Sequence, residues 1–503
     1  MNKRYEAVIG LEIHVQLKTK SKMFCRCSSD IWTEPPNTHT CPVCLGLPGA
    51  LPFPNKDAIE KAVKVGLALS CKPIPQSKFD RKNYFYPDLP KGFQISQYDL
   101  PFSQNGWVEI EVDGKRKKIG ITRAHLEEDT GKLIHQPING QPATLIDFNR
   151  SGIPLMEIVS SPDIRSASEA KTYAAKIQQI VRYLGVTEAD MEKGSMRVEP
   201  NVSLRKVSSI KYKVLSLPPY KVELKNINSF RSVEKAIEYE IKRQQELLDR
   251  REQPAQETRG WDEIKLKTYT QRTKEEAFDY RYFPEPDLPP VQLPKQLIAK
   301  LAAGLGELPN KKRQRFIKTF GLSDYDAEIL TRDVDLARFF EDAVISFAQT
   351  HVKGTKEVPT KSDAVKIANW IKGEVLASLN EFSKSVSEID FPPSGLSEIV
   401  YLVETRVITP QSGKIILAKW MRDGVKPTLL IKSLQAEKIS KEELLTIIKK
   451  VIDENPKAVS DFSSGKLAAL SFLIGQTQRK TGGKASVAII QDLLLANLQS
   501  SKN

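Results

Sequence analysis

Apolar and polar residues alternate along the first part of the chain in short runs that proline, glycine and asparagine interrupt. Because successive side chains of a strand point to opposite faces of its sheet, this alternation predicts short β-strands from Tyr5 to about Pro294. Two stretches with helical spacing, 168–183 and 233–250, lie among the strands. The pattern therefore predicts an α+β domain.

The pattern changes at a proline-rich stretch, 283–290, which is followed by Pro294. Such a stretch can continue neither a helix nor a central strand, so we interpret it as the end of the first domain. Beyond it, apolar residues recur at helical spacing in 311–320 and 324–347, and Ser323 is the expected N-cap of the second run. These runs predict a small helical domain.

A segment that contains glycine, proline and few large apolar residues, 351–361, predicts a hinge. After it come several amphipathic segments of helical period, at 364–379, 412–423, 441–454 and 466–474. The predicted organisation is a β-sheet domain (1–294), a small helical domain (295–350), the hinge (351–361) and an all-α tail domain (362–503).

The composition is that of a globular protein with an excess of basic residues. Its 503 residues, 40% of them hydrophobic, suffice for two or three packed cores. The 76 lysines and arginines outnumber the 62 acidic residues and leave a net charge of +14. This excess favours a polyanionic partner such as nucleic acid, although solvated basic faces are also common.

The sequence carries no sign of export or of membrane insertion. No stretch has the roughly 18 consecutive apolar residues of a membrane-spanning helix. The first residues run directly into the strand that contains Glu12 and His14, without the apolar core of a secretion signal. We therefore expect a cytoplasmic protein that has no membrane partner.

Four of the five cysteines form two close pairs. They are Cys25, Cys27, Cys41 and Cys44. Two such pairs can close a tetrahedral zinc site, and four protein ligands would make it structural rather than catalytic. Two alternatives are His39 in place of one thiol and four ordinary buried thiols. Paired free thiols fit a reducing compartment, and the unpaired Cys71 is expected in the core.

Two predicted strands carry polar residues at every second position. In the strand at 8–17, Glu12, His14 and Gln16 share one face, while apolar residues share the other. The strand at 194–205 alternates in the same way. Its polar face carries Arg197, Glu199, Asn201, Ser203 and Arg205. One such strand fits an ordinary solvated sheet face, but two together predict a continuous polar face.

Further charged segments suit a metal and a nucleotide. Glu127, Glu128 and Asp129 are three successive carboxylates close to His125, and such a cluster needs cations nearby. Carboxylates with an imidazole suit Mg²⁺ or Mn²⁺, the metals that accompany phosphates. Residues 80–87, DRKNYFYP, interleave two cations with three aromatic rings, as phosphate contacts and base stacking require. A complete GxxxxGK[ST] loop is absent, so an ATP site would be of another kind.

These segments together resemble the B-subunit family of the bacterial and organellar tRNA-dependent amidotransferases, over essentially the whole chain. The longest matching segments are VIGLEIH (8–14), DRKNYFYPDLP (80–90), HLEEDTGK (125–132) and DFNRSGIPLMEIV (147–159). Shorter matches follow the same order, at 36–38, 41–48, 94–98, 190–197, 225–230 and 279–290. So many matches in one order exclude a chance resemblance.

The resemblance implies a fold and an activity. The family fold is a cradle domain on a β-sheet, a small helical domain and a helical tail that binds tRNA. The cradle would use ATP to phosphorylate the side-chain carboxylate of misacylated Glu-tRNA(Gln), Asp-tRNA(Asn) or both. Ammonia from a glutaminase partner, the amidase-type A subunit, would then turn the acyl phosphate into an amide. A small C subunit would complete the heterotrimer.

The sequence itself is consistent with an external source of ammonia. The Gly-Ser-rich signature of amidases is missing, and no cysteine sits in a recognisable catalytic setting. Glutamine hydrolysis is therefore expected in another chain.

The resemblance also assigns roles to residues at matching positions. The implied catalytic residues and Mg²⁺ ligands are Glu12, His14, Glu127 and Glu128, with Glu157 as a further catalytic residue. The implied ATP and substrate pocket contains Arg81, Lys82, Tyr84, Arg150, Lys225 and Asn226. Mg²⁺ would neutralise phosphate oxygens while cationic side chains hold the phosphoryl group.

The chain departs from the family pattern at three places. It has Glu199 and Pro200 where the family usually has Asp-Ala, and Phe278 where the family has histidine. Near the end, residues 483–487 differ from the usual GKANP. The first departure lies on the predicted polar face and changes the contacts expected there.

The tail contains a basic segment. No acidic residue occurs from Phe462 to Gln491, and the cations there are Lys466, Arg479, Lys480 and Lys484. A solvated helix end with a basic loop has the same composition. Because the family's tail grips tRNA, we predict phosphate contacts for these cations.

Two other functions explain part of the sequence. A zinc-stabilised RNA-binding scaffold accounts for the charge and the cysteines, but not for Glu12, His14, Glu127 and Glu128. An aminoacyl-tRNA synthetase would also use ATP and tRNA, but the HIGH and KMSKS signatures are absent.

Overall fold

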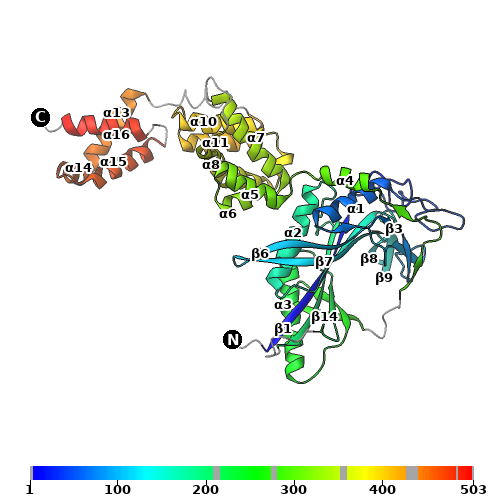
Figure 1. Cartoon of the computed structure of the whole chain (residues 1–503). Coiled ribbons are helices and arrows are strands. Elements are labelled where there is room, and N and C mark those ends of the chain that lie inside the picture. The colour runs from blue at the N-terminus through cyan, green and yellow to red at the C-terminus, as the bar shows by residue number, and fades with distance from the viewer. Residues whose placement is uncertain are drawn as a thin grey trace. The chain divides into compact units, whose positions relative to one another are not determined.

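The structure is a computed structural model that describes residues 4–207, 216–273, 280–351, 359–425, 440–482, 485 and 487–500. The chain divides into two compact units, Met1–Leu308 and Pro309–Asn503. Figure 1 shows their elements in colours that run from blue to red along the chain. Among the described residues, no helix combines the length and the apolar character that crossing a membrane requires.

The first unit is built on a nine-stranded sheet with the order β14-β13-β12-β11-β1-β10-β7-β6-β2. The strands are β1 (Tyr5–Gln16), β2 (Lys72–Pro73), β6 (Ser103–Val112), β7 (Lys115–Glu128), β10 (Pro154–Ser160), β11 (Met196–Lys206), β12 (Val222–Lys225), β13 (Glu257–Asp262) and β14 (Lys267–Thr273). Neighbouring strands are antiparallel except β12 and β13, which are parallel.

One face of this sheet is the core of the unit. The helices that pack there are α1 (Lys56–Ala68), α2 (Ala167–Tyr183) and α3 (Phe230–Asp249), and α4 (Lys295–Ala303) packs on α1. Ile9, Leu11 and Ile13 of β1 are fully buried in one hydrophobic cluster with residues of these helices. Because β1 alternates, its even-numbered side chains lie on the opposite face, which carries the candidate site.

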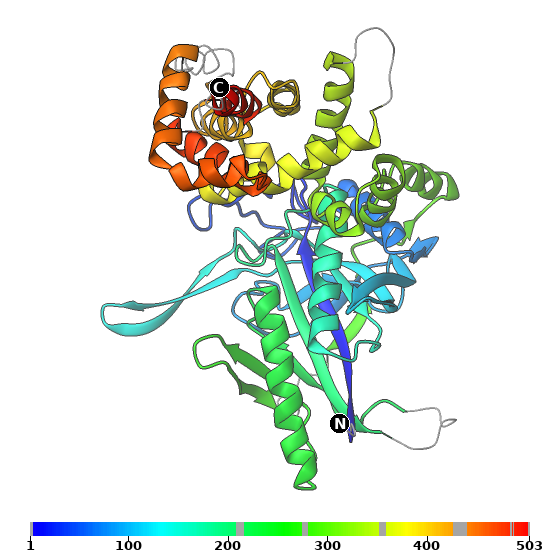
Figure 2. The same cartoon turned by 90° about the vertical axis from the view of Figure 1, so that its left-hand side faces the viewer.

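Smaller sheets complete the first unit. One has the order β15-β4-β5, with β4 (Asp80–Asn83), β5 (Phe93–Ser96) and β15 (Arg281–Pro284). Two pairs are formed by β3 (Gln76–Ser77) with β16 (Val291–Gln292), and by β8 (Lys132–Ile138) with β9 (Gln141–Asp147). Figure 2 shows the β6–β7 hairpin extending away from the rest of this unit.

Pro200 lies within the central strand β11, where a proline is unusual. Pairing with β1 continues past it through Leu11↔Pro200. Pairing with β12 consists of Asn201↔Glu223 and Val202↔Val222 and stops beside Pro200. Because proline has no N–H to donate, the end of this ladder at Pro200 has a direct chemical reason.

The second unit is helical. Its first group of helices is α5 (Pro309–Phe320), α6 (Asp324–Leu330), α7 (Val334–His351), α8 (Lys361–Trp370), α9 (Leu376–Phe382), α10 (Pro393–Glu404) and α11 (Pro410–Asp423), and one hydrophobic cluster runs through it from Phe316 to Met421. The second group is α13 (Lys441–Glu454), α14 (Pro456–Ser463), α15 (Leu467–Lys480) and α16 (Val487–Ser500), with its own cluster from Leu444 to Leu498.

The predicted α+β architecture, with a large sheet followed by helices, is confirmed. Ser323 caps α6 as expected, since its side chain accepts a hydrogen bond from the N–H of Asp326. The run predicted at 324–347 is two helices, α6 and α7. The first unit extends to Leu308 rather than Pro294, because α4 buries Leu301 in its core.

The clusters also group the helices differently from the predicted division at 351–361. The cluster from Phe316 to Met421 includes helices on both sides of that segment. Residues 352–358 of the predicted hinge lie outside the described residues, as do Phe278 and Lys484.

Candidate active site and cysteine cluster

The polar face of the large sheet is formed by side chains that the strand register brings side by side. His14 of β1 pairs with Glu157 of β10 on one side and with Arg197 of β11 on the other. Glu157 pairs in turn with His125 of β7. One row across four strands therefore reads His125, Glu157, His14, Arg197, although these residues are far apart in the sequence.

A first cluster of possible metal ligands lies in this row and next to it. His14, Glu127 and Glu157 each offer one ligand atom, and these atoms lie within 4.8 Å of one another. Nε2 of His14 is 3.4 Å from Oε2 of Glu157. Nε2 of His125 lies 3.4 Å from Oε1 of Glu127 and 3.5 Å from Oε2 of Glu157.

The charges in this cluster are strongly coupled. Burial alone would lower the pKa of His14, but the hydrogen bond to Glu157 and nearby carboxylates raise it to about 9. Burial would raise the pKa of Glu157, but His125 and His14 hold it at about 2. The His14 imidazolium thus balances carboxylate charge here. A divalent ion bound to His14, Glu127 and Glu157 would balance the carboxylate charge in place of the imidazolium. Such an ion requires a neutral imidazole as its ligand.

A second carboxylate cluster lies beside the first on the same face. Ligand atoms of Glu12, Glu199 and Glu223 lie within 4.8 Å of one another. Nζ of Lys225 is 3.0 Å from Oε2 of Glu199 and 3.5 Å from Oε1 of Glu223. Burial and the charge of Glu157 raise the pKa of Glu12. Burial would also raise the pKa of Glu199, but Lys225 and His14 hold it below its ordinary value.

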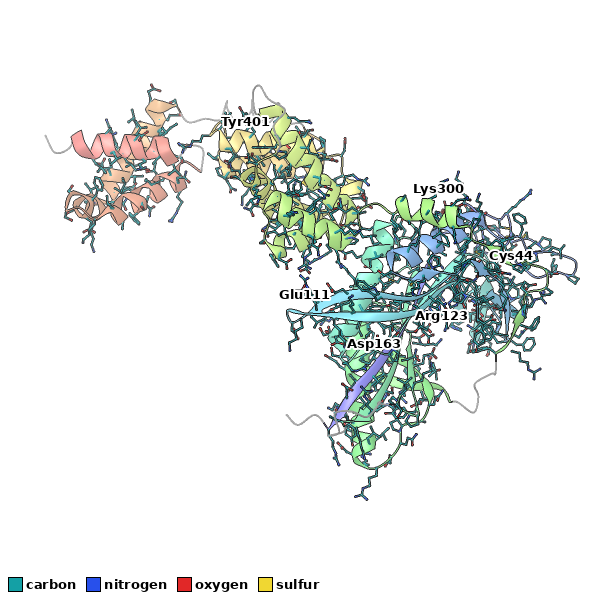
Figure 3. All side chains as sticks on the ribbon, in the orientation of Figure 1. Cys44, Glu111, Arg123, Asp163, Lys300 and Tyr401 are labelled. Atoms are coloured by element: carbon teal, nitrogen blue, oxygen red, sulfur yellow. The ribbon has the colours of Figure 1, made fainter. Side chains whose placement is uncertain are left out.

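Unpartnered polar atoms gather on this face. Among the described residues, seven have a buried side-chain nitrogen or oxygen without a hydrogen-bond partner, and five of the seven belong to the polar face. They are His14, Arg123, His125, Arg197 and Asn201. Buried polar atoms are rarely left unpaired in folded proteins, so this concentration indicates a place where a ligand supplies the partners. Arg123 is labelled on β7 in Figure 3.

Strand β5 connects the sheet to the segment 80–87. Ser96 donates a hydrogen bond to Oε1 of Glu127 at 2.7 Å, and Gln94 donates to Oε2 at 3.2 Å. On the neighbouring strand β4, burial would lower the pKa of Lys82, but Glu127 and other groups nearby raise it. Nζ of Lys82 also lies 6.0 Å from the ring centre of Tyr84. The predicted pocket residues Lys82 and Tyr84 are therefore near the first cluster.

Two of the predicted site residues lie elsewhere. Glu128 points to the side opposite Glu127, where its carboxylate contacts Lys91 Nζ and accepts a hydrogen bond from the N–H of Ile95 at 2.9 Å. Arg81 points away from Lys82 and forms a bidentate pair with the buried Glu285, at 2.7 and 2.9 Å. Successive side chains of a strand point to opposite faces, so Glu128 is separated from Glu127 and Arg81 from Lys82.

The other predicted pocket residues border the polar face. Arg150 donates to the carbonyls of Thr130 and Gly131 at 2.9 and 2.6 Å. Asp129 accepts from Gln16 at 2.7 Å and pairs with Arg197 at 2.7 Å. The side chain of Asn226, which follows Lys225, donates to the hydroxyl of Tyr269 at 3.2 Å.

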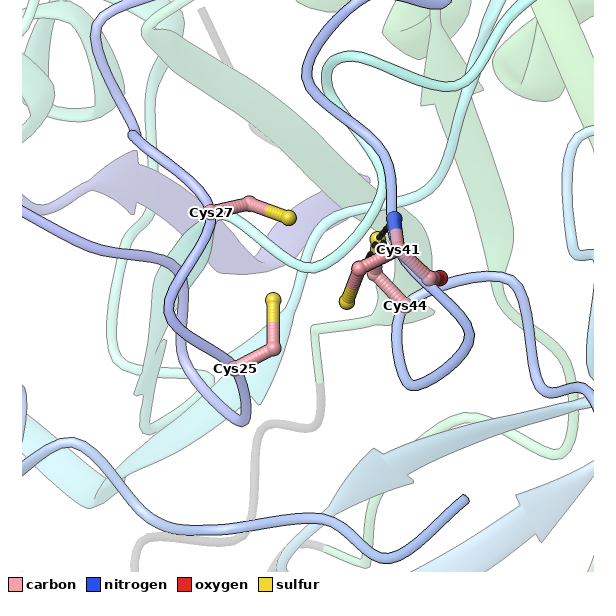
Figure 4. Close-up of side chains that lie close together, drawn as sticks. All are labelled: Cys25, Cys27, Cys41 and Cys44. Carbon is pink, nitrogen blue, oxygen red and sulfur yellow. Dashed lines mark hydrogen bonds between the residues drawn. The ribbon is translucent and has the colours of Figure 1, made fainter. Parts of the chain in front are cut away.

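The four cysteines meet as predicted. Figure 4 shows Cys25 and Cys27 on one loop and Cys41 and Cys44 on another, with the sulfur atoms facing a common centre. All four sulfurs lie within 4.8 Å of one another, and those of Cys41 and Cys44 are 3.8 Å apart. That separation is the edge of a tetrahedron with metal–sulfur distances of about 2.3 Å. The N–H of Cys41 also donates to the sulfur of Cys44 at 3.1 Å.

This set of four sulfur ligands fits a zinc ion. Two neighbouring residues, His39 and Lys22, lie beside the cluster and are not ligands. His39 is not among the four ligand residues of the cluster, and its ring lies 3.4 Å from a carboxylate oxygen of Glu34. Lys22 is 1% exposed, and its ammonium group lies 3.8 Å from the sulfur of Cys44. It also donates to the carbonyls of His39 at 2.8 Å and of Phe148 at 3.3 Å.

Near the end of the chain, two of the predicted tRNA-binding cations already have acidic partners. Lys466 lies 2.9 Å from Asp461, and Lys480 contacts Glu454. Both partners lie just outside the stretch that lacks acidic residues. Arg479 lies in the last turn of α15 and is exposed.

The sequence pointed to His125 only as a neighbour of the carboxylates 127–129, and it did not point to Arg123, Lys22 or Glu223 as members of these clusters. The period of two in β7 places His125 and Arg123 on the same face as Glu127, so alternation could have revealed them. Lys22 and Glu223 have no comparable local signal. Their positions follow from contacts with residues that are distant in the sequence.

Comparisons with known proteins match nearly the whole chain to proteins of one family. A family model of the GatB/GatE catalytic domain matches residues 7–299, and one of the GatB domain matches residues 355–498. A protein of Thermoanaerobacter pseudethanolicus is 46% identical over 497 residues, which cover 98% of this chain and 99% of the relative. One of Carboxydothermus hydrogenoformans is 44% identical over 494 residues, with 98% of each chain covered.

A third relative, from Dehalococcoides mccartyi, is 45% identical over 500 residues, with 99% of each chain covered. All three relatives are named as the B subunit of an aspartyl/glutamyl-tRNA(Asn/Gln) amidotransferase. With one family model that matches more than half of the chain and relatives of this similarity along its full length, the chain belongs to the GatB family.

Proposed function

We propose that this chain is the tRNA-handling subunit of an ATP-dependent, carbon–nitrogen-bond-forming amidotransferase. It converts Glu-tRNA(Gln), Asp-tRNA(Asn) or both into the amidated aminoacyl-tRNA. The relatives described above are named as B subunits of an aspartyl/glutamyl-tRNA(Asn/Gln) amidotransferase, which supports the amidotransferase part of the proposal. The observation that carries the proposal is the pair of adjacent clusters, His14 with Glu127 and Glu157, and Glu12 with Glu199 and Glu223.

The residues of these clusters suit phosphoryl transfer to a carboxylate. Carboxylates and one imidazole are ligands for Mg²⁺, which when bound neutralises phosphate oxygens. Lys82 and Lys225 place fixed positive charge beside the clusters, where it orients phosphate and carboxylate oxygens. Nε of Arg197, which is buried and has no hydrogen-bond partner in the described part of the chain, offers a further donor to an anionic group. Glu128 is not part of this proposed site.

Ammonia reaches the activated carboxylate from another chain in this proposal. The sequence has no amidase signature, so glutamine hydrolysis belongs to an A subunit, with a small C subunit in the same complex. Phosphorylation makes the side-chain carboxyl group an acyl phosphate, and attack by ammonia expels phosphate and leaves the amide. The cysteine cluster holds structural Zn²⁺ and takes no part in this chemistry.

The test uses the assembled complex with Glu-tRNA(Gln) and Asp-tRNA(Asn) as separate substrates. His14→Ala and Glu157→Gln should abolish ATP hydrolysis that depends on misacylated tRNA, because each variant removes a ligand of the first cluster. Glutaminase turnover should survive at least in part. His135→Ala is a matched control, since His135 is exposed on β8 and bonds only to Thr144 among the described residues.

Two results would contradict the proposal. One is a wild-type complex that amidates neither tRNA. The other is full ATP-dependent amidation by the His14→Ala complex.

A further inference from the structure

Two tyrosine rings stack at the edge of the first cluster. The ring centres of Tyr98 and Tyr282 are 4.4 Å apart, and the ring planes differ by 17°. Tyr282 lies on β15, opposite Lys82 of β4. Burial raises the pKa of its hydroxyl to about 12, and the charges of Glu127 and Glu157 act in the same direction, so the hydroxyl lies near these carboxylates. The inner ring of the pair therefore borders the first cluster.

The outer ring of the pair, that of Tyr98, is open to solvent. Tyr98 is 58% exposed, although its N–H donates to Oδ2 of the buried Asp80 at 3.0 Å. The preceding residue, Gln97, accepts a hydrogen bond from the N–H of Leu126 on β7 at 3.0 Å. The backbone is thus held in place while the face of the ring that is turned away from Tyr282 stays accessible. An aromatic face placed in this way is a stacking surface for a nucleobase.

Arg123 provides a positive charge next to the pair. Burial raises the pKa of Tyr282 and the charge of Arg123 acts against it, so the two side chains are close. Nε of Arg123 is buried and has no hydrogen-bond partner in the described part of the chain, and its Nη2 is 3.7 Å from Oε1 of Glu157. A buried donor without an acceptor indicates that a ligand supplies one. A nucleotide of a nucleic-acid strand offers both a flat ring for Tyr98 and an anionic oxygen for Arg123.

The order of strands in the large sheet indicates which nucleotide reaches this place. The second cluster lies on β12, β11 and β1, and the first lies on β1, β10 and β7. Arg123 and the tyrosine pair lie at the β7 side of the first cluster, on the side away from the second. The groups that give and receive a phosphoryl group lie roughly in line on opposite sides of it. With the donor's phosphates at the second cluster, the receiving carboxylate comes from the side of Tyr98.

We propose that Tyr98 stacks on the base of the 3′-terminal nucleotide of the misacylated tRNA and that Arg123 contacts the phosphate of that nucleotide. This inference rests on the proposed function, in which tRNA carries the carboxylate, and it names residues that hold the acceptor end. The aminoacyl group is joined to the ribose of the same nucleotide. Fixing the base and the phosphate therefore restricts the side-chain carboxylate to positions beside the first cluster.

A paired comparison tests the stacking in the full-length chain within its assembled complex. The change in the protein is Tyr98→Ala, and the change in the RNA is an uncharged tRNA that lacks its 3′-terminal nucleotide. The wild-type complex should bind the intact tRNA about tenfold more tightly than the shortened one, and Tyr98→Ala should lose most of this preference. Tyr98→Phe keeps the ring and should keep the preference. Tyr325→Ala is the matched control, because it removes an exposed tyrosine from α6.

Arg123→Gln tests the phosphate contact separately and does not depend on the behaviour of the Tyr98 variants. The slope of log affinity against log salt should fall by up to about 0.7 for the intact tRNA, because one contact with a single-stranded phosphate is lost. The slope for the shortened tRNA should not change, since that RNA lacks the phosphate. An unchanged slope for the intact tRNA would overturn the role of Arg123.

Other results would overturn the stacking. Tyr98→Ala could weaken both tRNAs equally or neither, which would place the base elsewhere. It could instead raise the Kd of a non-hydrolysable ATP analogue at unchanged tRNA affinity, which would assign the ring to the phosphoryl donor. A wild-type complex that amidates tRNA while Tyr98→Ala behaves like it would overturn this inference and leave the proposed function intact. A wild-type complex that amidates neither tRNA would overturn both.

Discussion

Two adjacent carboxylates, Glu127 and Glu128, have different environments because β7 alternates at this point. Glu127 faces His125 and the first cluster and accepts hydrogen bonds from Ser96 and Gln94. Glu128 faces Lys91 in a cavity that also borders the cysteine cluster. The pKa of Glu127 is well below its ordinary value, although burial acts in the opposite direction, because Lys82 and His125 stabilise its charge.

This difference predicts that the two carboxylates respond differently to the same substitution. Glu127→Gln should raise the Mg²⁺ concentration for half-maximal amidation by about tenfold or more, since it removes a proposed ligand. Glu128→Gln should leave the Mg²⁺ requirement unchanged and cost about 3 kcal/mol of stability, because it leaves Lys91 buried without its charged partner. Magnesium titrations and denaturant unfolding distinguish the two. Equal effects on the Mg²⁺ requirement would contradict the assignment.

The buried Lys22 beside the cysteine cluster should affect how tightly the cluster holds zinc. Four thiolates around Zn²⁺ leave a net negative charge, and the buried ammonium group beside Cys44 offsets part of it. Wild-type protein should contain one zinc per chain, and Lys22→Met should lose zinc to a chelator about tenfold more readily. The control is Lys20→Met, because Lys20 is exposed on the same loop. Equal zinc retention by both variants would contradict the role of Lys22, and zinc-free wild-type protein would contradict the zinc site itself.

At the level of elements, the pair Arg81–Glu285 joins β4 to the chain that follows β15. Arg81 also lies over the ring of Phe93, 4.2 Å from its centre, so it contacts all parts of the small sheet. Its guanidinium group is therefore occupied by contacts within the protein, with Glu285 and Phe93. The resemblance had placed Arg81 in the ATP pocket, and the geometry gives it a different role to be tested.

Arg81→Met should destabilise the protein by about 3–5 kcal/mol, because it leaves the carboxylate of Glu285 buried and unpaired. The double variant Arg81→Met with Glu285→Met should recover much of this loss, since both charges are then absent. Denaturant unfolding measures each free energy. A stable single variant with a raised KM for ATP would instead support the nucleotide-binding role.

At the level of the whole molecule, the helical unit contains two separate hydrophobic clusters. A deletion from residue 360 onward removes α8 to α11 and exposes the core that they share with α5 and α7. A deletion from residue 426 onward removes only the second cluster. The second deletion is therefore the one that tests the role of the tail without disrupting the first cluster.

Deleting 426–503 should preserve the unfolding temperature of the remainder and the glutaminase activity of the complex, but weaken tRNA binding. The slope of log affinity against log salt should fall by up to about 0.9 for each phosphate contact that is lost. Arg479 is the strongest candidate for such a contact, because Lys466 and Lys480 have acidic partners. Unchanged tRNA affinity across a salt series would refute the predicted role of the tail.

The local features of this protein follow from short segments of its sequence. Alternation identified β1 and β11 and the face of each that carries polar residues, and a period of 3.6 identified α2 and α3. The spacing of the cysteines predicted their cluster, and Ser323 predicted the start of α6. These features depend on residues that are close in the sequence, so one chain segment contains the information.

Which of these residues act together depends on the packing of segments that are distant in the sequence. Strand register places His14, Glu157 and His125 in one row, and it places Glu223 beside Glu12 and Glu199. A strand's period fixes the face on which a side chain lies, but not the strand that becomes its neighbour, because that choice depends on the packing of the whole sheet. The same non-local packing separated Glu128 from the other predicted ligands and buried Lys22 beside the cysteines.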